Sequence, residues 1–194
     1  MTEEEIIRGC LKNDRSSQRA LFEMFSANMT DVCMRYARDR QDAKEVLLNG
    51  FKAIYSDIRN YAEKEGKRKG DTPTISLSDW VKSKVINAVI RHMHQNKKQH
   101  FVSSTVSIRD AEKPVAEEVP EEKIILSANK QVIIKALQQL TPSYRVIYNM
   151  HEIDGYTHLE ISKLLDISEY LSKDSLSKAK FNLRKNLVKM LANK

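Results

Sequence analysis

The sequence predicts an all-α protein of two small helical domains joined by an acidic linker. Apolar residues recur at spacings of three and four along most of the 194-residue chain, which is the period of an amphipathic helix. Glycine and proline are scarce, at 5 and 4 residues, and alternating runs of strand-forming residues are absent outside 72–78. We predict domains at 1–99 and 128–194, with a flexible acidic linker at 100–127.

The composition sets the class of protein and its surroundings. A net charge of +7 and a pI near 9.3 favour a polyanionic partner if the charge clusters. Cys10 and Cys33 each fall inside an apolar helical pattern, so we expect buried thiols of a reducing compartment and no disulfide. No stretch approaches the roughly 18 apolar residues of a membrane span, and the N-terminus lacks a signal-peptide pattern. We therefore expect a soluble cytoplasmic protein.

Three helices are expected to share the first core. Thr2 and Glu5 have the spacing of a capping box and predict a short first helix. A second helix follows Asp14, with apolar positions at Leu21, Met24, Phe25, Met29, Val32, Cys33 and Tyr36. The third has them at Leu47, Phe51, Ile54, Tyr55, Ile58 and Tyr61.

The connections of this domain carry polar residues of interest. Residues 39–45 form a polar bend in which Asp42 is expected to cap the third helix, with Lys44, Glu45, Leu48 and Asn49 on its outer side. Residues 60–78 are rich in lysine and glycine and predict a flexible basic loop. Such a loop is usually a solvent-exposed connection. Tyr61 and the neighbouring cations also offer an aromatic face and phosphate attraction, which are the features that bind single-stranded nucleic acid.

A fourth helix is expected to begin near Ser78 or Asp79 and to have one basic side. Its surface positions are Lys82, Lys84, Asn87, Arg91, His94, Lys97 and Lys98. His92 and His94 diverge by about 200° around a helix, so they do not predict a metal site.

The pattern ends in the segment 101–127, which is rich in aspartate and glutamate. Pro114 and Pro120 oppose regular helix there. The segment is either a plain tether or an acidic arm that occupies a basic channel in a partner.

The C-terminal domain contains a helix-turn-helix pattern. A helix is expected from Thr141-Pro142 to Asp154-Gly155, with Pro142 at its first position. Thr157 and Glu160 form a second capping box and start a short helix.

The turn of the pattern is three residues long. Asp166 suits a left-handed turn, Ile167 can fill the angle between the helices, and Ser168 can cap the next helix. That last helix carries Lys173, Lys178, Lys180, Arg184, Lys185 and Lys189.

Two sets of motifs resemble sigma factors of the sigma-70 family, in particular the extracytoplasmic-function (ECF) group. Asp42-Ala-Lys-Glu-Val-Leu-Leu-Asn-Gly-Phe51 is similar to the Asp-Ala-Glu-Asp-x-x-Gln-Glu-Thr-Phe signature of region 2, and Trp80-Val-Lys-Ser-Lys-Val-Ile-Asn87 to its Trp-Leu-x-x-Ile-x-x-Asn helix. The order and spacing of region 4 are matched by Leu137-Gln-Gln-Leu-Thr-Pro142, Arg145-Val-Ile-Tyr148, Gly155-Tyr-Thr-His-Leu-Glu-Ile161 and Leu176-Ser-Lys-Ala-Lys180.

The resemblance implies a transcription initiation factor. Region 2 of such factors binds the clamp coiled coil of core RNA polymerase and melts the minus-ten element, and region 4 reads the minus-thirty-five element. By position, the polymerase contacts would be Asp42, Glu45, Leu48 and Asn49. The minus-ten contacts would be Tyr61, Asn87, Arg91, His94, Lys97 and Lys98. The minus-thirty-five contacts would be Ser168, Glu169, Tyr170, Ser172, Lys173, Asp174, Ser177 and Lys178.

The same resemblance implies the partners: core RNA polymerase, promoter DNA and an anti-sigma factor, with a free monomer and no cofactor. The chain has no zinc-protease motif, no phosphate-binding glycine loop and no cysteine pair at metal spacing, so an enzyme is not expected. His151, Glu152 and His158 are interpreted as helix-surface or turn residues.

Several positions depart from the sigma pattern. Leu48 and Asn49 replace Gln-Glu, and Lys44 replaces an acid. Tyr170-Leu171 and Asp174-Ser175 stand where Gly-Thr and Ser-Arg or Ser-Gln are frequent. These departures leave two alternatives open, a sigma-like interaction module that does not read DNA and a helix-turn-helix repressor that binds a palindrome as a dimer.

Overall fold

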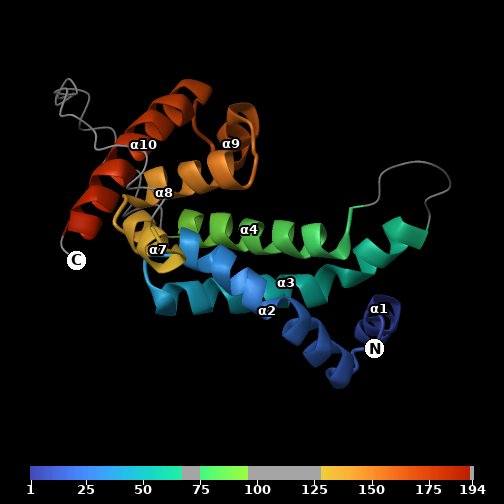
Figure 1. Ribbon diagram of the computed structural model, residues 1–194. Coiled ribbons are helices and arrows are strands. Elements are labelled where there is room, and N and C mark those ends of the chain that lie inside the picture. The colour runs from blue at the N-terminus through green and yellow to red at the C-terminus, as the bar shows by residue number, and fades with distance from the viewer. Residues whose placement is uncertain (67–74, 96–127, 193–194) are drawn as a thin grey trace. The chain divides into compact units, whose positions relative to one another are not determined.

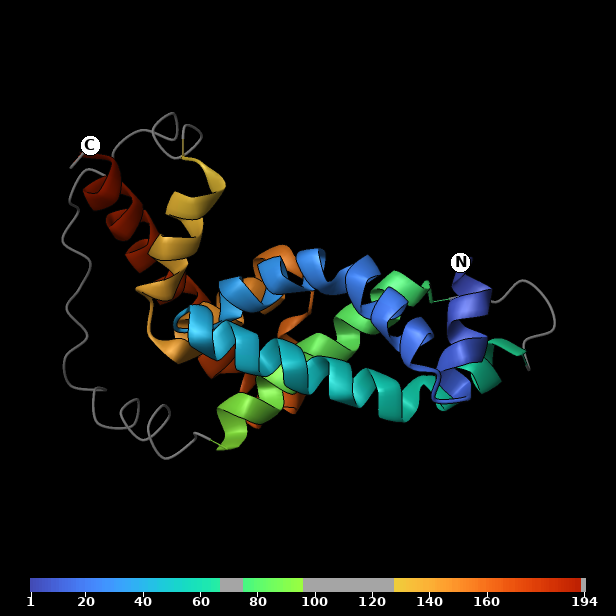
Figure 2. The same ribbon diagram turned by 90° about the horizontal axis from the view of Figure 1, so that it is seen from below.

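The computed structural model of the protein describes residues 1–66, 75–95 and 128–192 (Figures 1 and 2). All regular elements in these ranges are helices, which confirms the all-α prediction. None of the helices so described is long and apolar enough to cross a membrane. The chain divides into two compact units, Met1–Cys33 with Arg40–Arg91 and Met34–Asp39 with His92–Lys194.

The helices of the first unit are α1 (Glu3–Leu11), α2 (Arg15–Tyr36), α3 (Arg40–Gly66) and α4 (Leu77–Gln95). Helices α1 and α2 begin where their capping residues predict, whereas α4 begins one residue before the predicted Ser78. The capping box of α1 is confirmed, because Glu5 N donates to Thr2 Oγ1 at 3.3 Å and Thr2 N donates to Glu5 Oε2 at 2.8 Å. Asp14 caps α2 by accepting from Ser17 N at 2.8 Å.

Aromatic rings and one glycine join α2, α3 and α4. The rings of Phe22 and Phe51 lie 4.7 Å apart, and the Tyr55 hydroxyl donates to the Gln18 carbonyl at 2.8 Å. A Cβ on Gly50 would lie 3.0 Å from Val85 Cγ2, so this glycine allows α3 and α4 to approach closely. The unit therefore has one shared helical core.

Two predictions about α3 are wrong. Asp42 lies in the first turn of α3, which begins at Arg40, so it is not the capping residue. The helix continues to Gly66, so residues 60–66 are helical instead of loop. The extension is stabilised by packing, because the Tyr61 ring packs against the ring of Trp80 on α4, tilted by 35°. Residues 67–74 of the predicted loop lie outside the described residues, as do Lys97, Lys98 and the linker segment 100–127. Leu77 and Ser78, also predicted as loop, are the first residues of α4.

The second unit is built around its last helix. Its elements are α7 (Lys130–Gln138), α8 (Pro142–Tyr148), η2 (Asn149–Ile153), α9 (His158–Leu165) and α10 (Glu169–Ala192). Helix α10 packs against α7, α8 and α9, as Figure 1 shows. The core between α7 and α10 consists of Val132, Ala136, Leu137, Leu140, Ala179, Leu183 and Leu187.

The connection between α7 and α8 relies on a buried arginine. Pro142 is the first residue of α8 as predicted, but the Thr141 side chain makes no capping hydrogen bond. The Arg145 guanidinium instead donates from Nη1 to the Gln138 carbonyl at 3.0 Å and thereby satisfies the end of α7.

Both cysteines are buried and neither forms a disulfide, as predicted. The pKa of the Cys10 thiol is raised by burial and by the nearby Asp14 carboxylate. Cys10 is therefore a poor nucleophile.

Candidate nucleic-acid interface

The predicted helix-turn-helix is confirmed by its local geometry. Glu160 N donates to Thr157 Oγ1 at 3.2 Å and Thr157 N donates to Glu160 Oε2 at 2.8 Å, which completes the capping box of α9. Asp166 has φ 55° and ψ 53°, the left-handed conformation expected at the turn. Leu171 N donates to Ser168 Oγ at 3.0 Å, so Ser168 caps α10.

A small apolar core holds the two helices together. Ile161 and Leu165 of α9 and Leu176 and Ala179 of α10 are all buried. Their spacing of three or four places each pair on one side of its helix. The first turns of α10 therefore present their other side to solvent.

The exposed side of α10 contains most of the residues that the sequence suggested as contacts for the minus-thirty-five element. Those whose side chains are exposed are Ser168, Glu169, Tyr170, Lys173, Ser177 and Lys178. Tyr170 is 80% exposed, and Asp174 is half-buried. Ser172 is different, because it is 0% exposed and its hydroxyl lies 2.9 Å from His158 Nδ1. Ser172 therefore belongs to the interior of the motif and not to its outer face.

The lysines in the first half of α10 are engaged by acids. Lys173 Nζ lies 2.8 Å from Glu169 Oε1, and Lys178 Nζ lies 2.8 Å from Asp174 Oδ2. Hydrogen bonding to Asp174 raises the pKa of Lys178, and hydrogen bonding to Lys173 lowers the pKa of Glu169. The two acids and two lysines cancel in formal charge on this part of the helix.

The second half of α10 has a different charge. No acid follows Asp174 in the sequence of this helix, whereas Arg184, Lys185 and Lys189 are exposed. Phe181, on the same half, is also exposed. A polyanion would thus find uncompensated positive charge at the C-terminal half of α10.

The residues suggested for polymerase binding share one side of α3. Glu45, Leu48 and Asn49 are exposed, and Asp42 is half-buried one turn before Glu45. Leu48 is 46% exposed, whereas Val46 and Leu47 beside it are buried in the core. This face therefore combines polar side chains with an exposed leucine.

The residues suggested for minus-ten DNA are more dispersed. Asn87 and Arg91 are exposed and lie one turn apart on α4, and His94 is half-buried near its end. Tyr61 is only 9% exposed. Its ring lies 4.8 Å from that of Trp80, and its hydroxyl donates to the Ile75 carbonyl at 3.3 Å.

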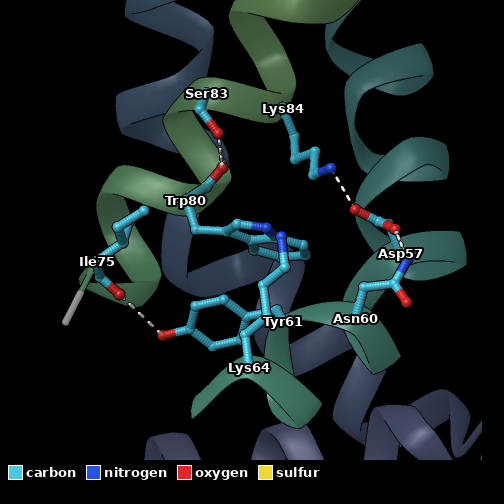
Figure 3. Close-up of a pocket in the computed structure, with 8 residues that line it drawn as sticks. All are labelled: Asp57, Asn60, Tyr61, Lys64, Ile75, Trp80, Ser83 and Lys84. Carbon is cyan, nitrogen blue, oxygen red and sulfur yellow. Dashed lines mark hydrogen bonds and ion pairs between the residues drawn. The ribbon is translucent and has the colours of Figure 1, made fainter. Parts of the chain in front are cut away.

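Tyr61 nevertheless lines a pocket of about 190 Å³ between α3 and α4 (Figure 3). The lining residues are Asp57, Asn60, Tyr61, Lys64, Ile75, Trp80, Ser83 and Lys84. Figure 3 shows the Tyr61 and Trp80 rings at its centre, with the Lys84 and Asp57 side chains directed toward one another. Aromatic rings and ammonium groups therefore meet in one concave site.

A polar network closes one side of the pocket. Lys84 forms an ion pair with Asp57, and its Nζ lies 5.5 Å from the centre of the Trp80 ring. Asn60 donates to the other oxygen of Asp57. Hydrogen bonds from Lys84 and then Asn60 lower the pKa of Asp57, so this carboxylate is charged at neutral pH.

Asp57, Asn60 and Lys84 were not expected in a site. Asp57, Asn60, Tyr61 and Lys64 have the spacing of one helix face, and this signal was hidden by the interpretation of residues 60–66 as a loop. Within the described residues, no group of three or more histidine, cysteine or acidic side chains could hold a metal ion.

Comparison with protein families identifies the C-terminal domain. No curated protein matches the chain. Residues 130–180 match the family described as Sigma-70, region 4. This range contains α7, α8, α9 and the first half of α10. Residues 130–180 thus form a domain similar to region 4 of sigma-70 proteins, with the helix-turn-helix of a DNA-binding element at its centre.

Proposed function

We propose that the protein is a transcription initiation factor of the sigma-70 type, in the extracytoplasmic-function group, that directs core RNA polymerase to specific promoters. The observation that carries this proposal is the coincidence of two findings on residues 130–180. They match region 4, and they hold a helix-turn-helix whose caps and turn have regular geometry. In this proposal the exposed side of α10 enters the major groove of the minus-thirty-five element.

The first unit supplies the polymerase and minus-ten functions. The face formed by Asp42, Glu45, Leu48 and Asn49 contacts the polymerase, with Leu48 as an apolar anchor. The pocket beside Tyr61 and Trp80 takes an unstacked base of the melted strand, and Lys64 and Arg91 attract its phosphates. The pocket supports this role because it combines a π surface with cations.

Reconstituted transcription tests the proposal. The purified full chain is added to core RNA polymerase from its native cell, with fragments of the same genome as templates. The expected result is a set of transcripts that start at defined positions and that neither component produces alone. If no fragment supports such transcripts while a known sigma factor does so with the same core enzyme, the proposal is wrong.

A second candidate function is an interaction module that binds polymerase or an anti-sigma partner without reading DNA. It is favoured by the ion pairs on α10, which occupy Lys173 and Lys178, and by the bulky Tyr170 on the same face. A gel shift with promoter fragments and a pulldown of core polymerase separate the two. Capture of polymerase without any shift of DNA would select the module.

A further inference from the structure

Two histidines in the second unit are stacked at the point where three elements meet. His151 belongs to η2, and His158 is the first residue of α9. Their ring centres lie 4.2 Å apart and the ring planes differ by 20°. His158 Nδ1 lies 2.9 Å from the hydroxyl of Ser172 on α10. A chain of side-chain contacts thus runs from η2 through α9 to α10.

We propose that His158 is a positioning residue for α10, and that its neutral imidazole holds Ser172 in place by accepting the hydrogen of the buried hydroxyl. The role of α10 in DNA recognition rests on the proposed function above, whereas the contacts themselves do not. The inference concerns how the first turns of this helix are held against α9.

The proton positions follow from the hydrogen bonds. His151 Nδ1 lies 2.8 Å from the Tyr156 carbonyl, which only accepts, so this nitrogen carries a hydrogen. Ser172 is fully buried, and its hydroxyl hydrogen therefore needs an acceptor. Neutral His158 supplies one at Nδ1. A protonated imidazole has two donors and no acceptor, so Nδ1 would then donate to Ser172 Oγ and the buried hydroxyl hydrogen would lose its acceptor.

Electrostatic repulsion between the two rings also disfavours protonation of His158. Two imidazolium ions stacked at 4.2 Å would repel one another in a partly buried site. The pKa of His158 is lowered below its ordinary value of 6.5, first by burial and then by His151 and Lys173. Glu169 and Glu152 oppose this shift without reversing it.

The other charged groups at this site are already paired. Glu152 lies 2.9 Å from Lys180 Nζ and 3.8 Å from His151 Nε2, and Glu169 pairs with Lys173. Their charges are therefore shared with lysines. Neutral His158 is consequently the form that fits the site.

The sign of the pH dependence follows from this lowered pKa. Below pH 6.5 the unfolded chain binds a proton at His158 that the folded state resists. Stability is therefore complete above 6.5 and is lost as the pH falls through that value and through the lower pKa of the folded state. Acid should loosen the attachment of α10 before it affects the carboxylate-based caps.

The test uses the full chain and needs no DNA. Melting temperature is followed by circular dichroism from about pH 5 to about pH 8 for the wild type and three variants. His158→Asn keeps an acceptor oxygen but cannot titrate in this range. His158→Leu removes the acceptor, and His92→Asn is the matched control on α4.

The wild type should lose roughly 3–5 °C per tenfold unfavourable change in the folding equilibrium as the pH falls below 6.5. His158→Asn should match the wild type near pH 8 and show a flatter profile below it. His158→Leu should be lower at every pH, and His92→Asn should follow the wild type. A His158→Asn profile that coincides with the wild type throughout would overturn the inference.

Direct titration keeps the test decisive if a variant does not fold. The imidazole resonances of the wild-type chain are followed by NMR against pH. His158 should titrate below 6.5, and a midpoint at or above that value would also overturn the inference. Since neither measurement involves nucleic acid, a failure here is distinct from a failure of the chain to act at promoters.

Discussion

Lys178 and Asp174 form an ion pair on α10, with Nζ 2.8 Å from Oδ2. Both side chains are more than a third exposed, so the pair contributes little to stability. Its effect on charge is larger, because the acid cancels a cation one turn away on the face proposed to meet DNA. The sequence suggested Asp174 as a DNA contact, whereas the structure shows its charge compensated by Lys178 of the same helix.

Removing the Asp174 charge should strengthen DNA binding. In Asp174→Asn the carboxylate no longer repels phosphates or offsets the charge of Lys178, which is worth on the order of threefold in affinity at moderate salt. Fluorescence anisotropy with a promoter duplex measures the change. Glu3→Gln, the same charge change on α1, is the control. Weaker binding of Asp174→Asn would show that the acid itself contacts a base.

Lys173 and Lys178 should each account for one phosphate contact. Lys173→Ala and Lys178→Ala are expected to weaken duplex binding and to reduce the slope of log affinity against log salt by about one unit each. Lys12→Ala, an exposed lysine that follows α1, should leave the slope unchanged. If the two α10 variants keep the wild-type slope, Lys173 and Lys178 are solvent-exposed side chains that contact no phosphate.

The turn before the helix-turn-helix depends on a glycine. Gly155 has φ 77°, and a Cβ placed there would meet nothing within 4 Å. Gly155→Ala should therefore cost about 1 kcal/mol through backbone strain alone. Urea unfolding of both variants measures it, with Gly155→Asn as the matched control. Asparagine tolerates this conformation better, so an equal cost for the two would contradict the strain argument.

The capping box of α9 should be measurable by mutation. Thr157→Ala removes the acceptor of Glu160 N and should lower the free energy of unfolding by about 1 kcal/mol. Thr157→Ser keeps the hydroxyl and should retain most of the stability. Equal losses in the two variants would assign the effect to the methyl group instead of the cap.

The same box has a pH dependence. Hydrogen bonds from Thr157 lower the pKa of Glu160 below its ordinary value of 4.5. The stabilisation is therefore complete above 4.5 and is lost as the pH falls through the lowered pKa. Glu160→Gln should remove that part of the acid sensitivity, which denaturant titrations at several acidic pH values would detect.

Trp80 provides a direct signal for the pocket. It is the single tryptophan of the chain, and it lines the pocket with Tyr61. A single-stranded minus-ten oligonucleotide that places a base there should quench its fluorescence. Lys64→Ala should shift this quenching to higher oligonucleotide concentration. Lys12→Ala is the control, and binding without any change in the signal would exclude the pocket.

Local pattern was sufficient for most of the fold. The capping boxes at Thr2 and Thr157 and the turn at Asp166 involve residues no more than five positions apart, so sequence spacing specifies their hydrogen bonds. The prediction failed at residues 60–66, where composition indicated a loop. That segment is helical because Tyr61 packs on Trp80, a contact between residues far apart in sequence.

The burial of Ser172 could have been predicted from the spacing of residues along α10. Ser172, Ser175 and Ala179 are spaced by three and four on the apolar stripe of α10, so a serine of this stripe faces the interior. The resemblance to sigma factors drew attention to the outer face instead. Sequence spacing alone still does not say which donor or acceptor a buried serine meets.

Sequence patterns were sufficient to predict the helical class, the helix-turn-helix and the basic character of the last helix, because these depend on local hydrogen bonding and composition. The polar groups that share a site were visible only in the folded chain. Folding placed His158 between His151 and Ser172, and it brought Lys84 to Asp57 beside the aromatic pocket. These contacts join different helices, and their geometry is set by core packing that no spacing along the chain records.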